Sequence, residues 1–184
     1  PLRLVGSEMC IRDRPIAREL HEQGCEVHAI VGFRNKDLVI LEDEFKAAAD
    51  RLILMTDDGT YGRHGLVTQP LQELLEAGET FDEVLAIGPV PMMKFVCRTT
   101  QPFGVHTMVS LNPIMVDGTG MCGGCRVTVG GETKFACVDG PEFDGHQVDF
   151  AELTSRNGTY RDREAEVKEN HVCRIESMGK ALIK

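Results

Sequence analysis

Short apolar runs alternate with amphipathic stretches over the first 110 residues of this 184-residue chain. Residues 26–31 read Glu-Val-His-Ala-Ile-Val, a run that suits a buried parallel strand. The same patterns predict further strands at residues 52–55, 84–87 and 105–110, and helices at residues 15–23, 37–50, 67–77 and 91–100. Strands separated by helices in this order predict βαβ units, so we expect an α/β protein with a parallel sheet.

Polar and glycine-rich turns follow the predicted strands. Ligands of parallel α/β sheets gather at the carboxyl ends of the strands, so these turns are candidates for a nucleotide site. Such turns also favour Gly, Asp and Pro for geometry alone, and any single one is about as often structural as functional. Gly88-Pro89 is the most suggestive, because a helix beginning there presents free N–H groups to an anion. The candidate binding residues are Gly32, Arg34, Asp57, Asp58, Gly59, Gly88, Pro89 and Met92.

The pattern changes after residue 110. Residues 126–129 and 133–136 are short β-like runs joined across Gly130-Gly131, which is a hairpin signal. Asp149 precedes Phe-Ala-Glu-Leu and is a candidate helix N-cap. Residues 160–170 are highly charged, which is typical of a solvated helix face.

The segment Asp117-Gly-Thr-Gly-Met-Cys122-Gly-Gly-Cys125, with Cys137 beyond the predicted hairpin, offers four metal ligands on one glycine-rich loop. Thiolates are the ligands of iron–sulfur clusters, and this spacing is that of plant-type ferredoxins with aspartate replacing the first cysteine. A loop around a small inorganic core needs glycine for positive φ and for close backbone approach. The hairpin would return Cys137 to the other three ligands. We therefore predict an iron–sulfur site with three sulfur ligands and one oxygen ligand.

Two other uses of these cysteines are weaker alternatives. A tetrahedral zinc site would use the same three cysteines and the aspartate. A disulfide is less favoured, because the chain has seven cysteines and neither a secretory signal nor a transmembrane run, a pattern typical of the cytoplasm. The remaining thiols stand alone and are expected to be buried or incidental: Cys10, Cys25, Cys97 and Cys173.

Charge and composition exclude some partners. The formal net charge is −9 and aromatic residues make up 5%, which argues against nucleic acid as a partner. The six histidines are scattered and none has metal-ligand spacing with another, so we expect surface or packing roles.

Several longer segments carry a resemblance to a known family. They are Gly-Phe-Arg-Asn-Lys-Asp-Leu from Gly32, Thr-Asp-Asp-Gly from Thr56, Ile-Gly-Pro-Val-Pro-Met-Met from Ile87, the stretch from Ser110 to Cys122, and Lys-Phe-Ala-Cys-Val-Asp-Gly-Pro-Glu-Phe from Lys134. From about residue 15 to 160 the chain resembles the small, alpha subunit of NADH-dependent reduced ferredoxin:NADP+ oxidoreductases, also described as sulfide dehydrogenase small subunits. The related electron transfer subunit of dihydroorotate dehydrogenase has four cysteine ligands, so Asp117 favours the transhydrogenase branch.

The resemblance implies a ferredoxin-reductase-like, partial NAD(P)-binding domain at residues 15–110, a small β-rich [2Fe-2S] domain at residues 111–160, and a charged tail at residues 161–184. It implies Asp117, Cys122, Cys125 and Cys137 as cluster ligands. In the family, electrons pass between NAD(H), FAD and the cluster to a larger flavin and iron–sulfur subunit, so we expect a cytoplasmic oxidoreductase subunit with no catalytic side chain of its own. A zinc-stapled interaction module and an inactive fragment are the other readings of this chain.

The start of the chain departs from the family. Family members begin with an FAD-binding barrel, followed by a strand and a glycine-rich phosphate loop, and both parts are expected to be missing here. Residues 7–14 resemble a translation of sequencing-adapter DNA. We therefore predict that residues 1–14 are a foreign head on a truncated reading frame.

Overall fold

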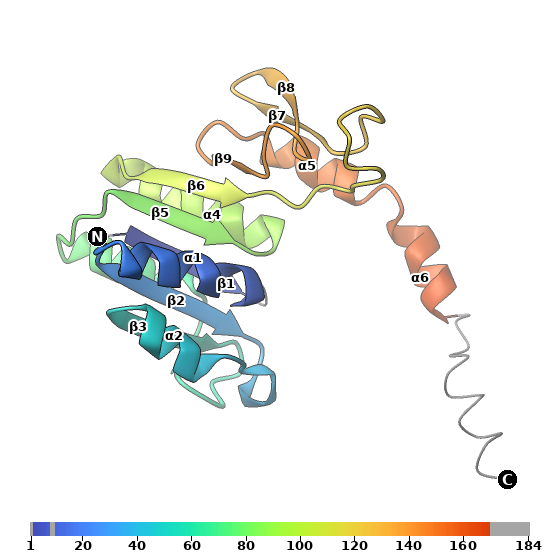
Figure 1. The fold of residues 1–184 in the computed structure, drawn as a ribbon. Helices are drawn as coiled ribbons and strands as arrows, with labels where there is room; N and C mark the ends of the chain where they lie inside the picture. The colour runs from blue at the N-terminus through green and yellow to red at the C-terminus, as the bar shows by residue number, and fades with distance from the viewer. Residues whose placement is uncertain (1, 8–9, 170–184) are drawn as a thin grey trace, which may run out of the picture.

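A parallel sheet forms the centre of the molecule (Figure 1). The computed structural model describes residues 2–7 and 10–169, and for residues 2–7 and 10–13 it describes the backbone. Within this part, seven strands form one sheet in the order β4-β3-β2-β1-β5-β6-β9, in which β9 alone runs antiparallel to its neighbour. The strands are β1 (Leu2–Ser7), β2 (Val27–Phe33), β3 (Arg51–Thr56), β4 (Arg63–His64), β5 (Glu83–Ile87), β6 (His106–Ser110) and β9 (Glu142–Asp144).

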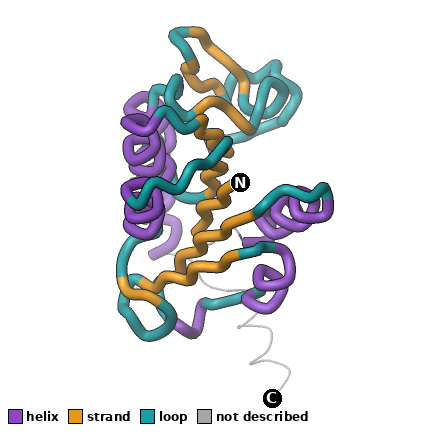
Figure 2. The backbone as a smooth tube through the Cα atoms, turned by 90° about the vertical axis from the view of Figure 1, so that its left-hand side faces the viewer, coloured by secondary structure: helices purple, strands orange, loops and turns teal. Residues whose placement is uncertain are grey.

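Helices cover both faces of the sheet (Figure 2). On one face α1 (Cys10–Glu22) and α2 (Glu42–Ala48) pack around Phe45, Ala17 and the buried strand β2. On the other face α3 (Thr68–Glu76) and α4 (Val90–Thr100) bury Leu71 and Met93. The α/β class and the parallel sheet predicted from the apolar runs are confirmed.

The helix predicted at residues 37–50 is wrong in its first half. A 3₁₀ turn, η1 (Lys36–Leu38), occupies that half, and α2 begins only at Glu42. The Asn35 side chain accepts the Leu38 N–H at 3.2 Å, and this local turn competes with a continuous helix. Leu41 has a φ of 58°, in the left-handed region, which separates the two elements.

The expectation that the strand before the first helix is missing is also wrong. Residues Leu2–Ser7 form β1, which lies between β2 and β5 and pairs in parallel with both. The first helix begins at Cys10 and not at residue 15. Backbone groups alone make a β ladder, so an apolar segment can occupy this place whatever its origin. The foreign origin of residues 1–14 stays a prediction.

A smaller unit follows β6. The hairpin of β7 (Arg126–Val129) and β8 (Glu132–Phe135) turns at Gly130 and Gly131, whose φ angles of 60° and 79° suit a type I′ turn. The second arm starts one residue earlier than predicted. The last turn of α4 continues into η2 (Gln101–Phe103).

Two helices close the described chain. The Asp149 carboxylate accepts the N–H groups of Ala151 and Glu152, both at 2.9 Å, and so caps α5 (Phe150–Asn157) as predicted. The charged stretch forms α6 (Arg161–Glu169), all of whose residues are exposed, which confirms the expected solvated helix. Among the described residues, no helix is long and apolar enough to cross a membrane.

Candidate metal centre and ligand pocket

The glycine-rich loop between β6 and β7 has the backbone geometry that a wrapped site needs. Gly118, Gly120 and Gly123 have φ angles of 74°, 80° and 68°, which side chains disfavour. Gly124 lacks a positive φ, but a Cβ there would lie 3.1 Å from Val116 and 3.5 Å from the Cys122 sulfur. Positive φ and close approach therefore account for all four glycines.

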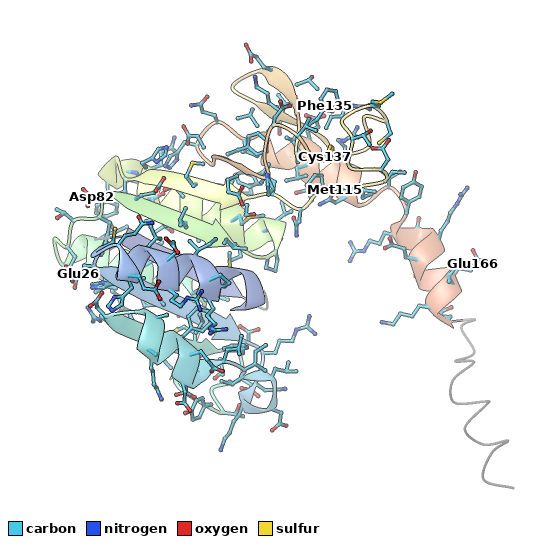
Figure 3. The ribbon with its side chains drawn as sticks, viewed as in Figure 1. Glu26, Asp82, Met115, Phe135, Cys137 and Glu166 are labelled. Atoms are coloured by element: carbon cyan, nitrogen blue, oxygen red, sulfur yellow. The ribbon has the colours of Figure 1, made fainter. Side chains whose placement is uncertain are left out.

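Cys125 and Cys137 lie together at the base of the hairpin, and Figure 3 labels Cys137. Their sulfurs are 3.2 Å apart, a hydrogen-bond contact between free thiols. The Ala136 N–H donates to the Cys125 carbonyl at 3.1 Å, so the two arms of the hairpin hold this pair. The neighbouring Cys125 thiol, and then burial, raise the pKa of Cys137. The hairpin thus returns Cys137 to Cys125, which is one of the three ligands that the spacing predicted beside it.

Asp117 and Cys122 form the second pair, on the exposed part of the loop. The pKa of Asp117 lies below its usual value, first because the Thr119 N–H donates to the carboxylate at 2.9 Å, and further because of a hydrogen bond with Cys122. The carboxylate is therefore ionised at neutral pH and stands beside a thiol.

The four predicted ligands are two pairs and not one tetrahedron. Among the residues described, no three His, Cys, Asp or Glu side chains converge as a site for a single metal ion. Tetrahedral zinc would require these four side chains around one point. Binuclear iron–sulfur clusters instead take two protein ligands on each iron, so the donor set fits a [2Fe-2S] group.

Backbone N–H groups also point at the sulfurs. The Gly124 N–H lies 3.3 Å from the Cys122 sulfur. The Gly120 backbone makes a hydrogen bond with Cys137 that lowers the pKa of this thiol, against the larger effects of Cys125 and burial. Such donors stabilise negative charge on sulfur, and they are one means by which proteins tune cluster potentials.

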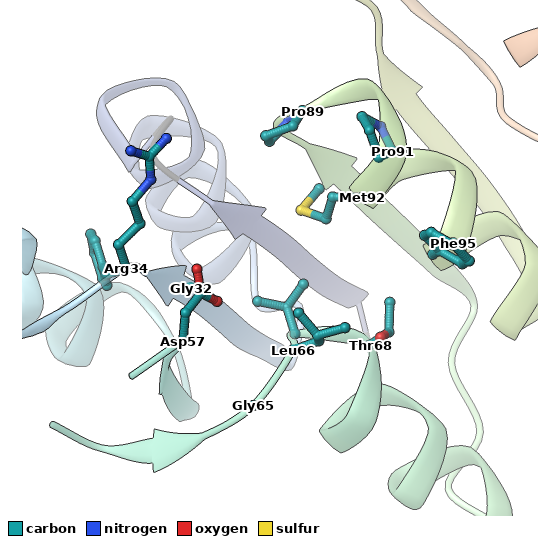
Figure 4. A pocket seen from close by; sticks show the side chains of 12 residues that line it. Gly32, Arg34, Asp57, Gly65, Leu66, Thr68, Pro89, Pro91, Met92 and Phe95 are labelled. Atoms are coloured by element: carbon teal, nitrogen blue, oxygen red, sulfur yellow. The ribbon is translucent and has the colours of Figure 1, made fainter. Parts of the chain in front are cut away.

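A separate pocket opens at the carboxyl ends of β2, β3 and β5 (Figure 4). Its volume is about 360 Å³, at the lower end of the range of about 300–1,000 Å³ for small-molecule sites. Gly32, Arg34 and Asp57 line one side, and Met92 and Phe95 of α4 line the other. The pocket combines charged groups with an apolar wall, which suits a ligand that has a charged and a planar part.

Most of the predicted binding residues reach this pocket. Those that line it are Gly32, Arg34, Asp57, Pro89 and Met92. Asp58, Gly59 and Gly88 are not among its lining residues. Asp58 accepts the Thr60 hydroxyl at 2.7 Å and the Thr60 N–H at 3.0 Å, contacts that lower its pKa and close the turn after β3.

Sequence reasoning missed several lining residues: Phe33, Gly65, Leu66, Val67, Thr68, Pro91 and Phe95. Leu66 and Phe95 are 62% and 54% exposed, so they offer apolar surface to a ligand. An apolar side chain on the outer face of a predicted helix was the available signal for Phe95.

The isolated thiols behave largely as expected. Cys97 is buried and Cys25 is half-buried, whereas the side chains of Cys10 and Cys173 lie outside the described part. Burial, and then the charge of Asp144, raise the pKa of Cys97 to about 12.

Cys97 is therefore expected to stay unreactive while Cys122 reacts. In metal-free native protein, Ellman's reagent should label the exposed Cys122 thiol and leave Cys97 unlabelled until the chain unfolds. The Cys97 pKa is higher in the folded chain, so the thiol loses its proton at lower pH in the unfolded chain. The free energy of unfolding should therefore fall as the pH rises from about 9 to about 12. Mass spectrometry of labelled peptides checks this, and rapid native labelling of Cys97 would contradict the buried placement.

Comparisons with known proteins show which proteins the chain is similar to. Residues 112–149 match the family model for the iron–sulfur cluster binding domain of dihydroorotate dehydrogenase B, and the match includes all four predicted ligands. The chain is 52% identical over 150 residues to the "dihydroorotate dehydrogenase B (NAD(+)), electron transfer subunit homolog" of Thermotoga maritima, covering 82% of this chain and 52% of the relative. The chain is therefore homologous to part of these electron transfer subunits.

Two further proteins are similar to this chain. An uncharacterized protein of the adh 3′ region of Clostridium beijerinckii is 51% identical over 155 residues, covering 84% of this chain and 52% of the relative. The solved structure of an NADH-dependent reduced ferredoxin–NADP oxidoreductase, a system of flavin-based electron bifurcation, matches with 48% identity and a TM-score of 0.82 over 92% of this chain and 61% of its own. The chain thus spans about half the length of the curated relatives it matches.

Proposed function

We propose that this chain relays electrons within a flavin and iron–sulfur oxidoreductase, through a [2Fe-2S] cluster bound by Asp117, Cys122, Cys125 and Cys137. The observation that carries the proposal is the arrangement of these four side chains in two pairs on a glycine-rich loop. The iron–sulfur domain match over the same residues supports it.

The two pairs would divide the ligands between two irons. Cys125 and Cys137 would hold one iron, and Asp117 with Cys122 the other. A carboxylate is a harder ligand that donates less electron density than a thiolate, so the two irons would be electronically unequal. The glycine N–H groups at Cys122 and Cys137 would stabilise the sulfur charge.

The pocket at the carboxyl ends of the strands is the proposed nicotinamide nucleotide site. Arg34 and the N-terminus of α4 would attract the phosphates, and the apolar wall of Met92 and Phe95 would contact a ring. The nucleotide would supply hydride chemistry when bound, and the chain's own residues would bind and orient it and exclude water.

The proposed partner is a larger flavin and iron–sulfur subunit that docks beside the cluster loop. Val116, Met121 and Val138 on or next to the loop are 76%, 88% and 55% exposed. Clustered exposed apolar side chains are costly in water and mark interaction surfaces, so they support a partner at this place. The names of the relatives favour a second candidate partner, a dihydroorotate dehydrogenase catalytic subunit.

Metal analysis tests the proposal directly. Protein purified without oxygen is expected to contain about two irons and two acid-labile sulfides per chain, and to absorb visible light through sulfur-to-iron charge transfer. Iron and sulfide assays with a visible spectrum provide the measurement. Stoichiometric zinc with a colourless protein would contradict the proposal and favour a zinc-stapled interaction module.

A further inference from the structure

Two arginines contact the loop from outside, on consecutive peptide groups. Arg126, the first residue of β7, donates from Nη1 to the Gly123 carbonyl at 3.3 Å. Arg156, in the last turn of α5, donates from Nη2 to the Gly124 carbonyl at 3.2 Å. Both carbonyls lie between Cys122 and Cys125, the two predicted ligands that are nearest in the sequence. This short segment is therefore contacted by side chains of both β7 and α5.

These contacts fix the orientation of the peptide planes. The two peptide groups are trans, so the C=O and the N–H of each point in opposite directions. The Gly123 carbonyl points to Arg126, and the N–H of the same peptide group, that of Gly124, reaches the Cys122 sulfur at 3.3 Å. In the same way the Gly124 carbonyl points to Arg156, so the Cys125 N–H of that peptide group points away from the Arg156 guanidinium.

The α5 helix is a firm support for this contact. Phe150 and Leu153 anchor it in the core with 7% and 1% exposure. Arg156 itself is half-buried, and the adjacent Asn157 donates from Nδ2 to the Asn112 carbonyl at 3.3 Å. The end of α5 therefore contacts the chain both before Asp117 and between Cys122 and Cys125.

We propose that Arg126 and Arg156 are positioning residues for the cluster, and that they raise its reduction potential. This inference rests on the proposed function. Arg126 holds the Gly124 N–H toward the Cys122 sulfur, Arg156 fixes the next peptide group, and the two side chains place two positive charges beside the loop. Reduction of the cluster by one electron adds a negative charge, which nearby cations and N–H donors stabilise.

The test compares matched arginine variants of the full chain. Arg156→Gln removes the charge from the loop, Arg156→Lys retains the charge without the planar fork, and Arg163→Gln removes an equal charge from the exposed helix α6. Iron and sulfide content is measured first, followed by the midpoint potential and the electron paramagnetic resonance spectrum of the reduced protein. Hydrogen–deuterium exchange of the iron-free protein reports on residues 113–125.

Arg156→Gln is expected to lower the midpoint potential, change the reduced-state spectrum and increase exchange in the loop. Arg156→Lys should recover part of the potential, and Arg163→Gln should leave all three unchanged. Equal potentials in Arg156→Gln and Arg163→Gln would overturn the inference while leaving the proposed function intact. If Arg156→Gln fails to fold, Arg126→Gln at the exposed position decides by the same readouts. A wild-type chain without iron would overturn both proposals.

Discussion

Replacing Cys125 by alanine is expected to abolish cluster binding. Cys125 is 2% exposed, and its sulfur lies 3.2 Å from that of Cys137, so it is the most enclosed of the four predicted ligands. No other thiol of the described chain stands beside this pair to replace it. Iron content per chain should fall from about two to near zero, together with the visible absorption.

Two further variants define the ligand set. Asp117→Cys should keep the iron and shift the reduction potential, because a thiolate there completes a four-cysteine set. Cys25→Ala is the matched control, since it removes a half-buried thiol far from the loop in sequence and should leave the iron content unchanged. Full iron content in Cys125→Ala, or an unchanged spectrum and potential in Asp117→Ala, would show that the ligands are wrongly assigned.

The second large effect concerns the nucleotide: this chain alone is expected neither to hold FAD nor to oxidise NADH at a measurable rate. In such folds much of the dinucleotide affinity comes from N–H groups of a glycine-rich turn between the first strand and helix. Here the sequence from Gly6 to Cys10 contains no second glycine. Each lost charge-assisted hydrogen bond costs about 1.5–3 kcal/mol, roughly a 10- to 150-fold loss of affinity.

Calorimetric titration with NADH and a diaphorase assay with added FAD measure these expectations. The Kd for NADH should exceed about 1 mM, which is the weak end of specific association. Flavin should not change the turnover, because the described residues form no barrel domain to bind it. Micromolar NADH binding with flavin-dependent turnover would show that the N-terminal segment supplies the missing contacts.

The apolar periodicity predicted the middle of the molecule well, because each signal there is local. Runs such as residues 84–87 are too apolar for a surface strand, and their helices repeat apolar positions at helical spacing. Gly130 and Gly131 likewise determine a turn, because both adopt the positive φ angles that the turn requires. Once the hairpin is predicted, the return of Cys137 toward the other ligands follows, and the structure shows this contact for Cys125.

Features that depend on distant partners were not readable. β9 is three residues long and becomes a strand only by pairing with β6, so its own sequence carries little signal. Phe95 lines the pocket because three strand ends bring other residues opposite to it. The Arg156 side chain donates to the Gly124 carbonyl, 32 positions away in the sequence. A single arginine in a helical sequence gives no indication of such a contact.

The place of β1 has a consequence for the folding of the chain. Leu2 lies opposite Val27 on one side and opposite Glu83 on the other, so β1 is paired on both edges only after β5 has been made. Pairing between such distant segments is slow, and until it occurs β2 and β5 each present an unpaired edge. Unpaired edges associate with those of other chains. Once β1 lies between them, the facing edges of β2 and β5 are paired and no longer open to other chains.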